Sequence, residues 1–102
     1  PMIERIVLLK LKPEFVPQAR PICTHVGTVL ATIEHVRGVG ALPAADERTA
    51  GAWDLVIRLQ FDDMDAVDRY LPDPMHRALV DEYLKPRTDK LEAFNFDLGP
   101  RT

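Results

Sequence analysis

The chain has 102 residues, of which 46% are hydrophobic, and a formal net charge of -3 with no cluster of lysine or arginine. This length and composition suit one domain with its own core, and the charge argues against binding to nucleic acid or to an anionic membrane surface. The single cysteine, Cys23, excludes an internal disulfide framework, and no apolar run approaches the ~20 residues that span a bilayer. We therefore expect one cytoplasmic domain over residues 1–102.

The first expected element is a strand over residues 2–11, where apolar side chains occupy both alternating faces. A strand that is buried on both sides has this pattern. Apolar residues then recur every three or four positions from Ala19 to Ile33, which predicts an amphipathic helix that ends before Gly38. Pro21 indicates either that the regular helix begins near it or that the helix is kinked there.

The middle of the chain is expected to hold a weak second strand within residues 35–44, followed by an exposed loop, "AADERTAGA". The next stretch, "WDLVIRLQF", is the clearest strand of the sequence, because large apolar side chains occupy every second position. A short helix, "DDMDAVDRYL", is expected after it, with Asp62 or Asp63 as its N-terminal cap.

A histidine stands close to the start of the last expected helix, in "YLPDPMHRALVDEY". Asp73 can cap this helix and Pro74 suits its first position, so His76 falls in the first turn of a helix that extends to Pro86. "KLEAFNFDL" then closes the chain as a strand. The resulting order, βαββαβ, predicts a single α+β domain with a ferredoxin-like fold.

Such a fold covers one face of its sheet with helices and leaves the other face open. The residues expected on the open face are Glu4, Ile6, Leu8, Lys10, Asp54, Val56, Arg58, Gln60, Phe94 and Phe96. This mixture is too apolar for a free surface and too polar for a monomer core, so we expect a homodimer that packs sheet against sheet. The four charged members would then be able to pair across the interface.

Two segments resemble the stress-responsive A/B barrel family, known as Dabb, whose members are dimeric α/β barrels. "IERIVLLKLK" is similar to the opening strand "IxHIVLFKFK" of that family, and "YLPDPMH" is similar to its "YxxHPxH" segment. The resemblance spans essentially the whole chain. It departs from the family pattern at two positions, because Arg5 stands in place of the usual first-strand histidine and Asp73 in place of the histidine of the "HP" pair.

The resemblance implies a cavity between the sheet and the helices that binds a small hydrophobic, aromatic or polyketide-like molecule. The chain is similar at Tyr70 and His76 to the olivetolic acid cyclase type of protein, in which the matching side chains line the pocket and carry out an aldol condensation. His76 and Tyr70 are therefore the candidate catalytic residues of a cofactor-free cyclase, lyase or isomerase-like reaction. The residues expected to contact the ligand are Arg5, Val7, Leu9, Leu55, Ile57 and Leu79.

Each of the polar candidates has a second, purely structural interpretation. His76 is either a neutral general base or a residue that donates a ring proton to a carbonyl, and Tyr70 either directs its hydroxyl toward His76 or only buries its ring. Arg5 shares a face with apolar residues, so its guanidinium needs an acidic partner from a neighbouring strand, the commoner arrangement, or an anionic ligand.

Two other functions remain open from the sequence. One is a non-catalytic stress-response or interaction protein whose pocket is filled by side chains, and the other is a cofactor-independent monooxygenase. A metal site is not expected, because the histidines lack the spacing of metal ligands.

Overall fold

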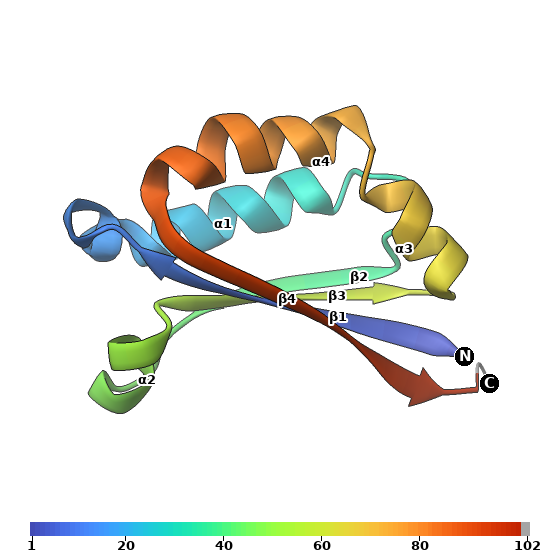
Figure 1. Cartoon of the computed structure of the whole chain (residues 1–102), viewed down its shortest axis with the longest axis horizontal. Helices are drawn as coiled ribbons and strands as arrows, with labels where there is room; N and C mark the ends of the chain where they lie inside the picture. The colour runs from blue at the N-terminus through green and yellow to red at the C-terminus, as the bar shows by residue number, and fades with distance from the viewer. Residues whose placement is uncertain (101–102) are drawn as a thin grey trace.

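The computed structural model describes residues 1–100 as a four-stranded antiparallel sheet with helices over one face (Figure 1). The strands are β1 (Met2–Leu11), β2 (Gly38–Pro43), β3 (Leu55–Phe61) and β4 (Thr88–Gly99). Their order in the sheet is β2-β3-β1-β4, and all neighbouring pairs are antiparallel. The expected α+β, ferredoxin-like fold is confirmed.

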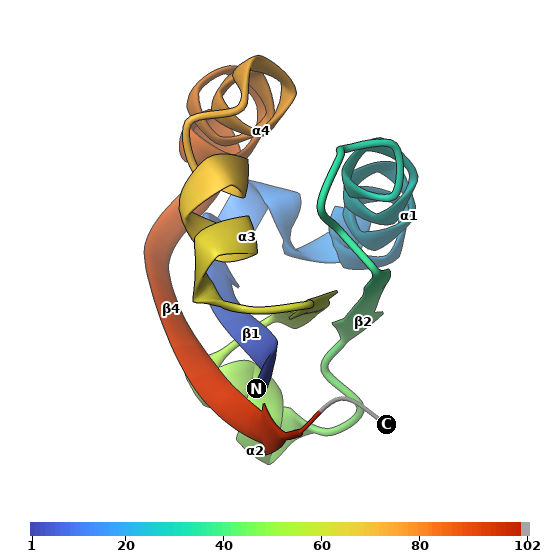
Figure 2. The same cartoon turned by 90° about the vertical axis from the view of Figure 1, so that its right-hand side faces the viewer.

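Two helices lie side by side on the covered face of the sheet. Helix α1 (Ala19–Leu30) lies over β2, and α4 (Pro74–Ala78) lies nearer to β4 and β1 (Figure 2). Helix α4 continues as a π-helical segment, Leu79–Leu84, and then as a 3₁₀ turn, Lys85–Arg87. The predicted helix that extends to Pro86 is thus present, but its second half has a wider winding than an α-helix.

The start of α1 follows one of the two possibilities that Pro21 allowed. A 3₁₀ segment, Pro13–Gln18, precedes the regular helix, which begins at Ala19. Pro21 therefore stands in the first helical turn, where its missing N–H would have no partner within the helix. Four side chains on one face of α1 are buried against the sheet, namely Ile22, Cys23, Val26 and Leu30.

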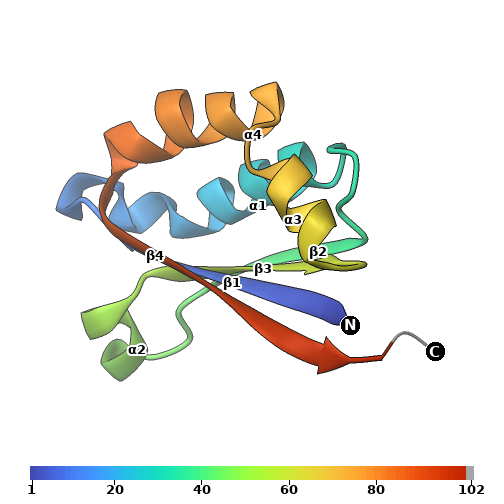
Figure 3. The ribbon, with the colours of Figure 1, turned by 45° about the vertical axis from the view of Figure 1, so that its right-hand side comes forward.

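The expected loop "AADERTAGA" contains a short helix, α2 (Glu47–Ala52), and the prediction is wrong at this point. Asp46 caps α2 by accepting a hydrogen bond from the Thr49 backbone N–H at 2.8 Å. Helix α2 buries no side chain and lies well apart from α1 and α4 (Figure 3). Because the sequence signal for a helix is an apolar stripe, a short exposed helix of this kind leaves no such signal.

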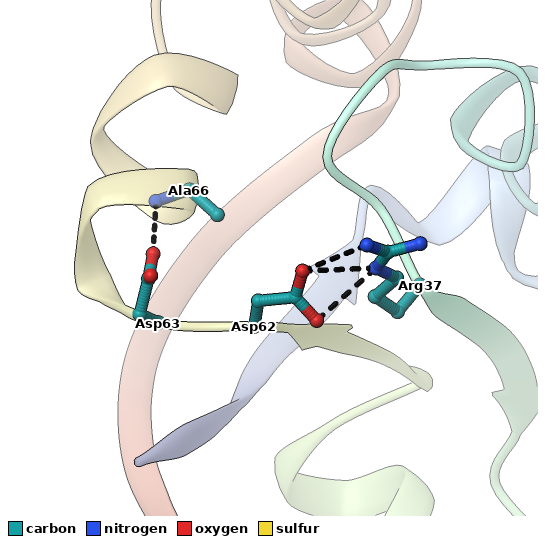
Figure 4. Close-up of polar contacts among 4 residues, drawn as sticks. All are labelled: Arg37, Asp62, Asp63 and Ala66. Atoms are coloured by element: carbon teal, nitrogen blue, oxygen red, sulfur yellow. Dashed lines mark hydrogen bonds and ion pairs between the residues drawn. The ribbon is translucent and has the colours of Figure 1, made fainter. Parts of the chain in front are cut away.

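Two adjacent aspartates follow β3 and have different partners (Figure 4). Asp63 accepts a hydrogen bond at 2.8 Å from the backbone N–H of Ala66, so it is the cap of α3 (Met64–Tyr70). Both carboxylate oxygens of Asp62 bind the Arg37 guanidinium, with 2.8 Å between Asp62 Oδ2 and Arg37 Nη2. Of the two caps that the sequence allowed, the structure uses Asp63.

The open face of the sheet carries exposed apolar side chains between ion pairs that form within one chain. Phe94 lies opposite Ile6 and is 45% exposed, and Phe96 lies opposite Glu4 and is 57% exposed. Arg58 pairs with Glu4, with 2.7 Å between Arg58 Nη2 and Glu4 Oε1.

The remaining charged pair expected on that face is also satisfied internally. Asp54 is buried, accepts a hydrogen bond from the Leu11 backbone N–H at 2.8 Å and pairs with Lys10 at 3.2 Å. We expected these four charged residues to pair between two copies, but they pair within one chain. Within residues 1–100, none of the helices is both long enough and apolar enough to cross a membrane.

Candidate functional site

A pocket of about 180 Å³ lies between the sheet and the helical segment that begins at α4. Its walls are largely apolar and include Val7 and Ile57 from the sheet and Leu79 and Leu84 from the helical segment. Polar side chains at the pocket are Arg5, Tyr70, His76 and Arg77. The site therefore combines an apolar interior with a small number of polar groups, which is the usual make-up of a small-molecule site.

Two local features leave space at this position. Ala93 on β4 lies opposite Val7, so two small side chains face the pocket from neighbouring strands. Above them, three residues of the π-helical segment, Leu79, Val80 and Leu84, form the facing wall. Short π-helical segments occur frequently at functional sites in proteins, because they locally change how side chains project from a helix.

His76 is held in the first turn of α4 by the cap that the sequence predicted. Asp73 Oδ1 accepts hydrogen bonds from the backbone N–H groups of Met75 and His76, at 2.8 and 3.4 Å. Pro74 occupies the first helical position, where no N–H is needed. The imidazole is buried, with 8% of the residue exposed.

The hydrogen bond of the His76 ring defines its tautomer. His76 Nδ1 lies 2.8 Å from the carbonyl oxygen of Leu71. Because a carbonyl oxygen can only accept a hydrogen bond, Nδ1 carries a proton, and the lone pair of the neutral ring is on Nε2. None of residues 1–100 forms a hydrogen bond with Nε2. The ring thus has one nitrogen fixed by the backbone and a second nitrogen that is free to act as a base.

The electrostatic surroundings keep this imidazole neutral. Burial lowers the pKa of His76 below its ordinary value of 6.5, and the positive charges of Arg77 and Arg5 lower it further. The hydrogen bond to Leu71 and the charge of Asp73 act in the opposite direction. Burial is the largest of these effects, so the low pKa follows mainly from the position of the ring inside the protein.

Tyr70, the last residue of α3, stacks against His76. The two ring centroids are 4.3 Å apart and the rings are tilted by 42°. Tyr70 is only 2% exposed, and burial raises the pKa of its phenol well above the ordinary value, against a smaller opposite effect of Arg5. The hydroxyl forms no hydrogen bond with any residue in the described part of the chain. It is therefore a neutral hydrogen-bond donor without a partner among residues 1–100.

Arg5 does not have the acidic partner that the sequence led us to expect. Its Nη1 donates a hydrogen bond at 3.0 Å to the side-chain oxygen of Asn95, a neutral group on β4. No acidic side chain among residues 1–100 forms an ion pair with Arg5. Burial lowers the pKa of the Arg5 guanidinium, but an arginine remains charged at physiological pH. The pocket thus contains a cation whose charge is not balanced by an adjacent carboxylate.

The structure brings together six of the eight residues that the sequence suggested for the site. His76, Tyr70, Arg5, Val7, Ile57 and Leu79 all line the pocket. Leu9 and Leu55 do not, because they lie two positions further along the same sheet face, where they are 0% and 2% exposed. These two belong to the core, which corrects their assignment as ligand contacts.

Several residues of the pocket were not suggested by the sequence. Ala93 lies in a strand and has no reactive group, so the sequence does not single it out. Its position opposite Val7 on the neighbouring strand places it at the pocket. Leu84 lies two turns beyond His76, and Arg77 stands at the pocket with an ion pair to Asp81 at 2.8 Å. Helical spacing from His76 would have identified Leu84 and Val80, whereas nothing in the sequence singles out Arg77.

The family of the chain follows from a comparison with protein-family models. The model of the Stress responsive A/B Barrel Domain, Dabb, matches residues 3–98. The chain belongs to the Dabb family. A comparison of the sequence with curated proteins gives no match. The more specific similarity to olivetolic acid cyclase is not confirmed by these comparisons.

Solved structures share the fold of this Dabb domain at low sequence identity. A Dabb family protein with a ferredoxin-like fold from Mesorhizobium loti has a TM-score of 0.78 and 22% identity, over 96% of this chain and 98% of that chain. A dimeric ferredoxin-like protein of unknown function from Thermobifida fusca has a TM-score of 0.75 and 23% identity, over 95% of this chain and 91% of that chain.

An enzyme is also among the structural neighbours of the Dabb domain. The hydroxynitrile lyase from Passiflora edulis has a TM-score of 0.78 and 11% identity, over 99% of this chain and 96% of that chain. At these identities the similarity concerns the fold alone. Within residues 1–100, no group of three or more His, Cys, Asp or Glu side chains is arranged to hold a metal ion.

Proposed function

We propose that this Dabb domain is a homodimer that binds a small hydrophobic or aromatic compound in the pocket under α4 and acts on it by cofactor-free acid/base chemistry. The observation that carries the proposal is the fixed tautomer of His76. Its Nδ1 proton is held by Leu71, while Nε2 has no partner among residues 1–100 and its ring stacks on Tyr70 beside the pocket.

The two side chains have complementary roles in a proton transfer from carbon. The neutral Nε2 takes a proton from the carbon next to a carbonyl group of the ligand, and the electron pair of the broken C–H bond moves onto the carbonyl oxygen. The Tyr70 hydroxyl donates a hydrogen bond to that oxygen and so stabilises the enolate. Return of the proton to a different carbon is an isomerisation. Attack of the carbanion on a second carbonyl closes a ring, and the alkoxide that forms takes the proton back from Nε2 of His76.

The hydrogen bond to Leu71 fits a structural histidine as well as a base, and it is the position of the ring at the pocket that supports the base. A structural histidine needs that bond and nothing more, so its second nitrogen would be expected to face solvent or another protein group. In this chain the second nitrogen belongs to a ring that lines an apolar pocket. A pocket of about 180 Å³ also argues against a non-catalytic protein whose cavity is filled by side chains.

The open face of the sheet supports the homodimer. Phe94, Phe96 and Leu42 are exposed on this face in the single chain, and apolar surface of this kind is normally covered by a partner. Arg58 and Glu4 neutralise each other there, so burial of this pair leaves neither of the two charges isolated. The related protein from Thermobifida fusca is described as dimeric.

Exchange of carbon-bound protons tests the chemistry directly. Phenylacetone, a neutral ketone with one aromatic ring, is incubated with the protein in D₂O, and the loss of its α-proton signal is followed by NMR. We expect the unmodified protein to accelerate exchange, and His76→Gln and Tyr70→Phe to reduce the acceleration.

His25→Gln is the matched control, because His25 is exposed on α1 and does not line the pocket. Equal acceleration by the unmodified protein and by His76→Gln would contradict the proposed base. Consumption of oxygen with an electron-rich phenol would instead support the monooxygenase alternative.

A further inference from the structure

The charge balance of the pocket indicates the chemical class of its ligand. Arg5 lines the pocket and has one neutral partner, the Asn95 side-chain oxygen at 3.0 Å. A guanidinium has five N–H donors, so most of its donors remain available after this bond. The Arg5 side chain is partly exposed and its bond to Asn95 is exposed, so the remaining donors are open to an anion that enters the pocket.

Two acidic residues of the helical segment above the pocket, Asp73 and Asp81, are already committed to other partners. Asp73 accepts the two backbone N–H groups at the start of α4. Asp81 pairs with Arg77 at 2.8 Å and with Lys85 at 3.1 Å, on the outer side of the same helical segment. Arg5 and Arg77 both act on His76, since their charges lower the pKa of the imidazole. Of the two arginines that line the pocket, Arg77 is paired with Asp81, so the positive charge without an acidic partner is that of Arg5, although the whole chain has a net charge of -3.

The size of the pocket limits the ligand as well. Its volume of about 180 Å³ is close to that of a cavity of about 150 Å³ that accepts benzene. It is below the roughly 300–1,000 Å³ that is usual for sites of drug-sized ligands. One aromatic ring with a small substituent fits this space.

We infer that the pocket binds a small carboxylate with a single aromatic ring or an apolar body of similar size, and that Arg5 recognises the carboxylate. This inference rests on the proposed function and adds the ligand class to it. The apolar body lies against Val7, Ile57 and Leu79, and His76 and Tyr70 contact the ligand from α4 and α3.

A pair of ligands with the same shape and different charge tests the inference. Benzoate and its neutral analogue benzamide are titrated separately into the ¹⁵N-labelled protein, and binding is followed by amide NMR shifts. We expect benzoate to bind at least about ten-fold more tightly than benzamide, because a charge-assisted contact with Arg5 forms only with the anion. Bound benzoate should also raise the pKa of His76, because a nearby negative charge stabilises imidazolium.

Variants of Arg5 separate this contact from general electrostatic attraction. Arg5→Gln should abolish the preference for benzoate and leave benzamide binding unchanged, and Arg48→Gln should preserve the preference. Arg48 is a suitable control because it is exposed on α2, away from the pocket. Arg5→Lys keeps the charge and should retain part of the preference for benzoate. This variant provides the test if Arg5→Gln does not fold.

The outcomes distinguish the inference from the function on which it rests. Equal affinity of the unmodified protein for benzoate and benzamide, with shifts at the pocket, would overturn the role of Arg5 and leave a neutral-ligand pocket intact. A benzoate preference that persists in a folded Arg5→Gln variant would also overturn it. An absence of shifts at the pocket with both ligands would contradict the inference and the proposed function together.

Discussion

The Nδ1 atom of His76 donates its proton to the carbonyl oxygen of Leu71, which lies 2.8 Å away and five residues earlier in the chain. Leu71 directly follows the last residue of α3, and His76 is in the first turn of α4. The bond therefore connects the two short helices across the turn "LPDP" and fixes the ring over the pocket. It also determines which ring nitrogen can accept a proton from a ligand.

Asp73 is expected to stabilise the fold through its capping of α4. Asp73→Ala removes the acceptor of two backbone hydrogen bonds, so the free energy of unfolding should fall by about 1 kcal/mol. Urea denaturation measures this change. Asp68→Ala, a substitution of an exposed aspartate on α3, is the control and should have little effect. A denaturation midpoint that is the same in Asp73→Ala and in the unmodified protein would contradict the role of the cap.

The stability of the protein should depend on pH through His76. The folded state lowers the pKa of His76 below 6.5, so the unfolded chain binds more protons at this residue than the folded chain does. Above pH 6.5, the pKa of the unfolded chain, His76 makes its full contribution to the free energy of unfolding. This contribution is lost as the pH falls from there through the lower pKa of the folded state. Chemical denaturation at several pH values should show this loss, and His76→Gln should show less of it. Parallel pH profiles for the two proteins would exclude the linkage.

The exposed phenylalanines of β4 are expected to hold two copies together. Phe96 is 57% exposed in the single chain, so Phe96→Asp should leave the fold of the monomer intact and weaken association. Light scattering after size exclusion gives the mass in solution. Met64→Asp changes a similarly exposed apolar residue on α3 and should leave the mass unchanged. A monomeric unmodified protein at micromolar concentration would contradict the dimer.

Ala93 offers a way to close the pocket without touching its polar groups. Ala93→Leu adds apolar atoms opposite Val7, where the space of the pocket is, so ligand binding should be lost while the melting temperature is kept or raised. Amide NMR shifts on addition of benzoate, together with a thermal melt, test both parts. Ala52→Leu on the exposed end of α2 is the control. Undiminished binding in the folded Ala93→Leu variant would show that the ligand binds elsewhere.

The elements of the fold could be predicted because each one has a strong local signal. The alternation in "WDLVIRLQF" predicts β3, and the Asp-Pro pair at residues 73–74 predicts the start of α4. The short helix α2 was missed because it buries no side chain and so has no apolar periodicity. The π-helical winding of Leu79–Leu84 was missed as well, since the apolar spacing there is compatible with an ordinary α-helix.

The candidate site could be predicted only in part, because it depends on how distant segments are aligned. The sequence places Val7 and Leu9 on one face of β1 but does not say which of them lies under α4. The hydrogen bond between Arg5 and Asn95 joins residues that are 90 positions apart and depends on the register of β1 against β4. Tyr70 and His76 were identified by their resemblance to a family segment, and the geometry adds the tautomer and the stacking distance.

The central claim is that Nε2 of His76 is an unprotonated base that faces a ligand in the pocket, and ¹⁵N NMR of the histidine rings tests it most directly. Near neutral pH we expect the His76 ring to be neutral, with a proton on Nδ1 and none on Nε2, and to titrate below 6.5. Addition of benzoate should shift the Nε2 resonance and leave that of exposed His25 unchanged. A neutral ring with its proton on Nε2, or a ring that neither titrates nor responds to benzoate or benzamide, would contradict the account.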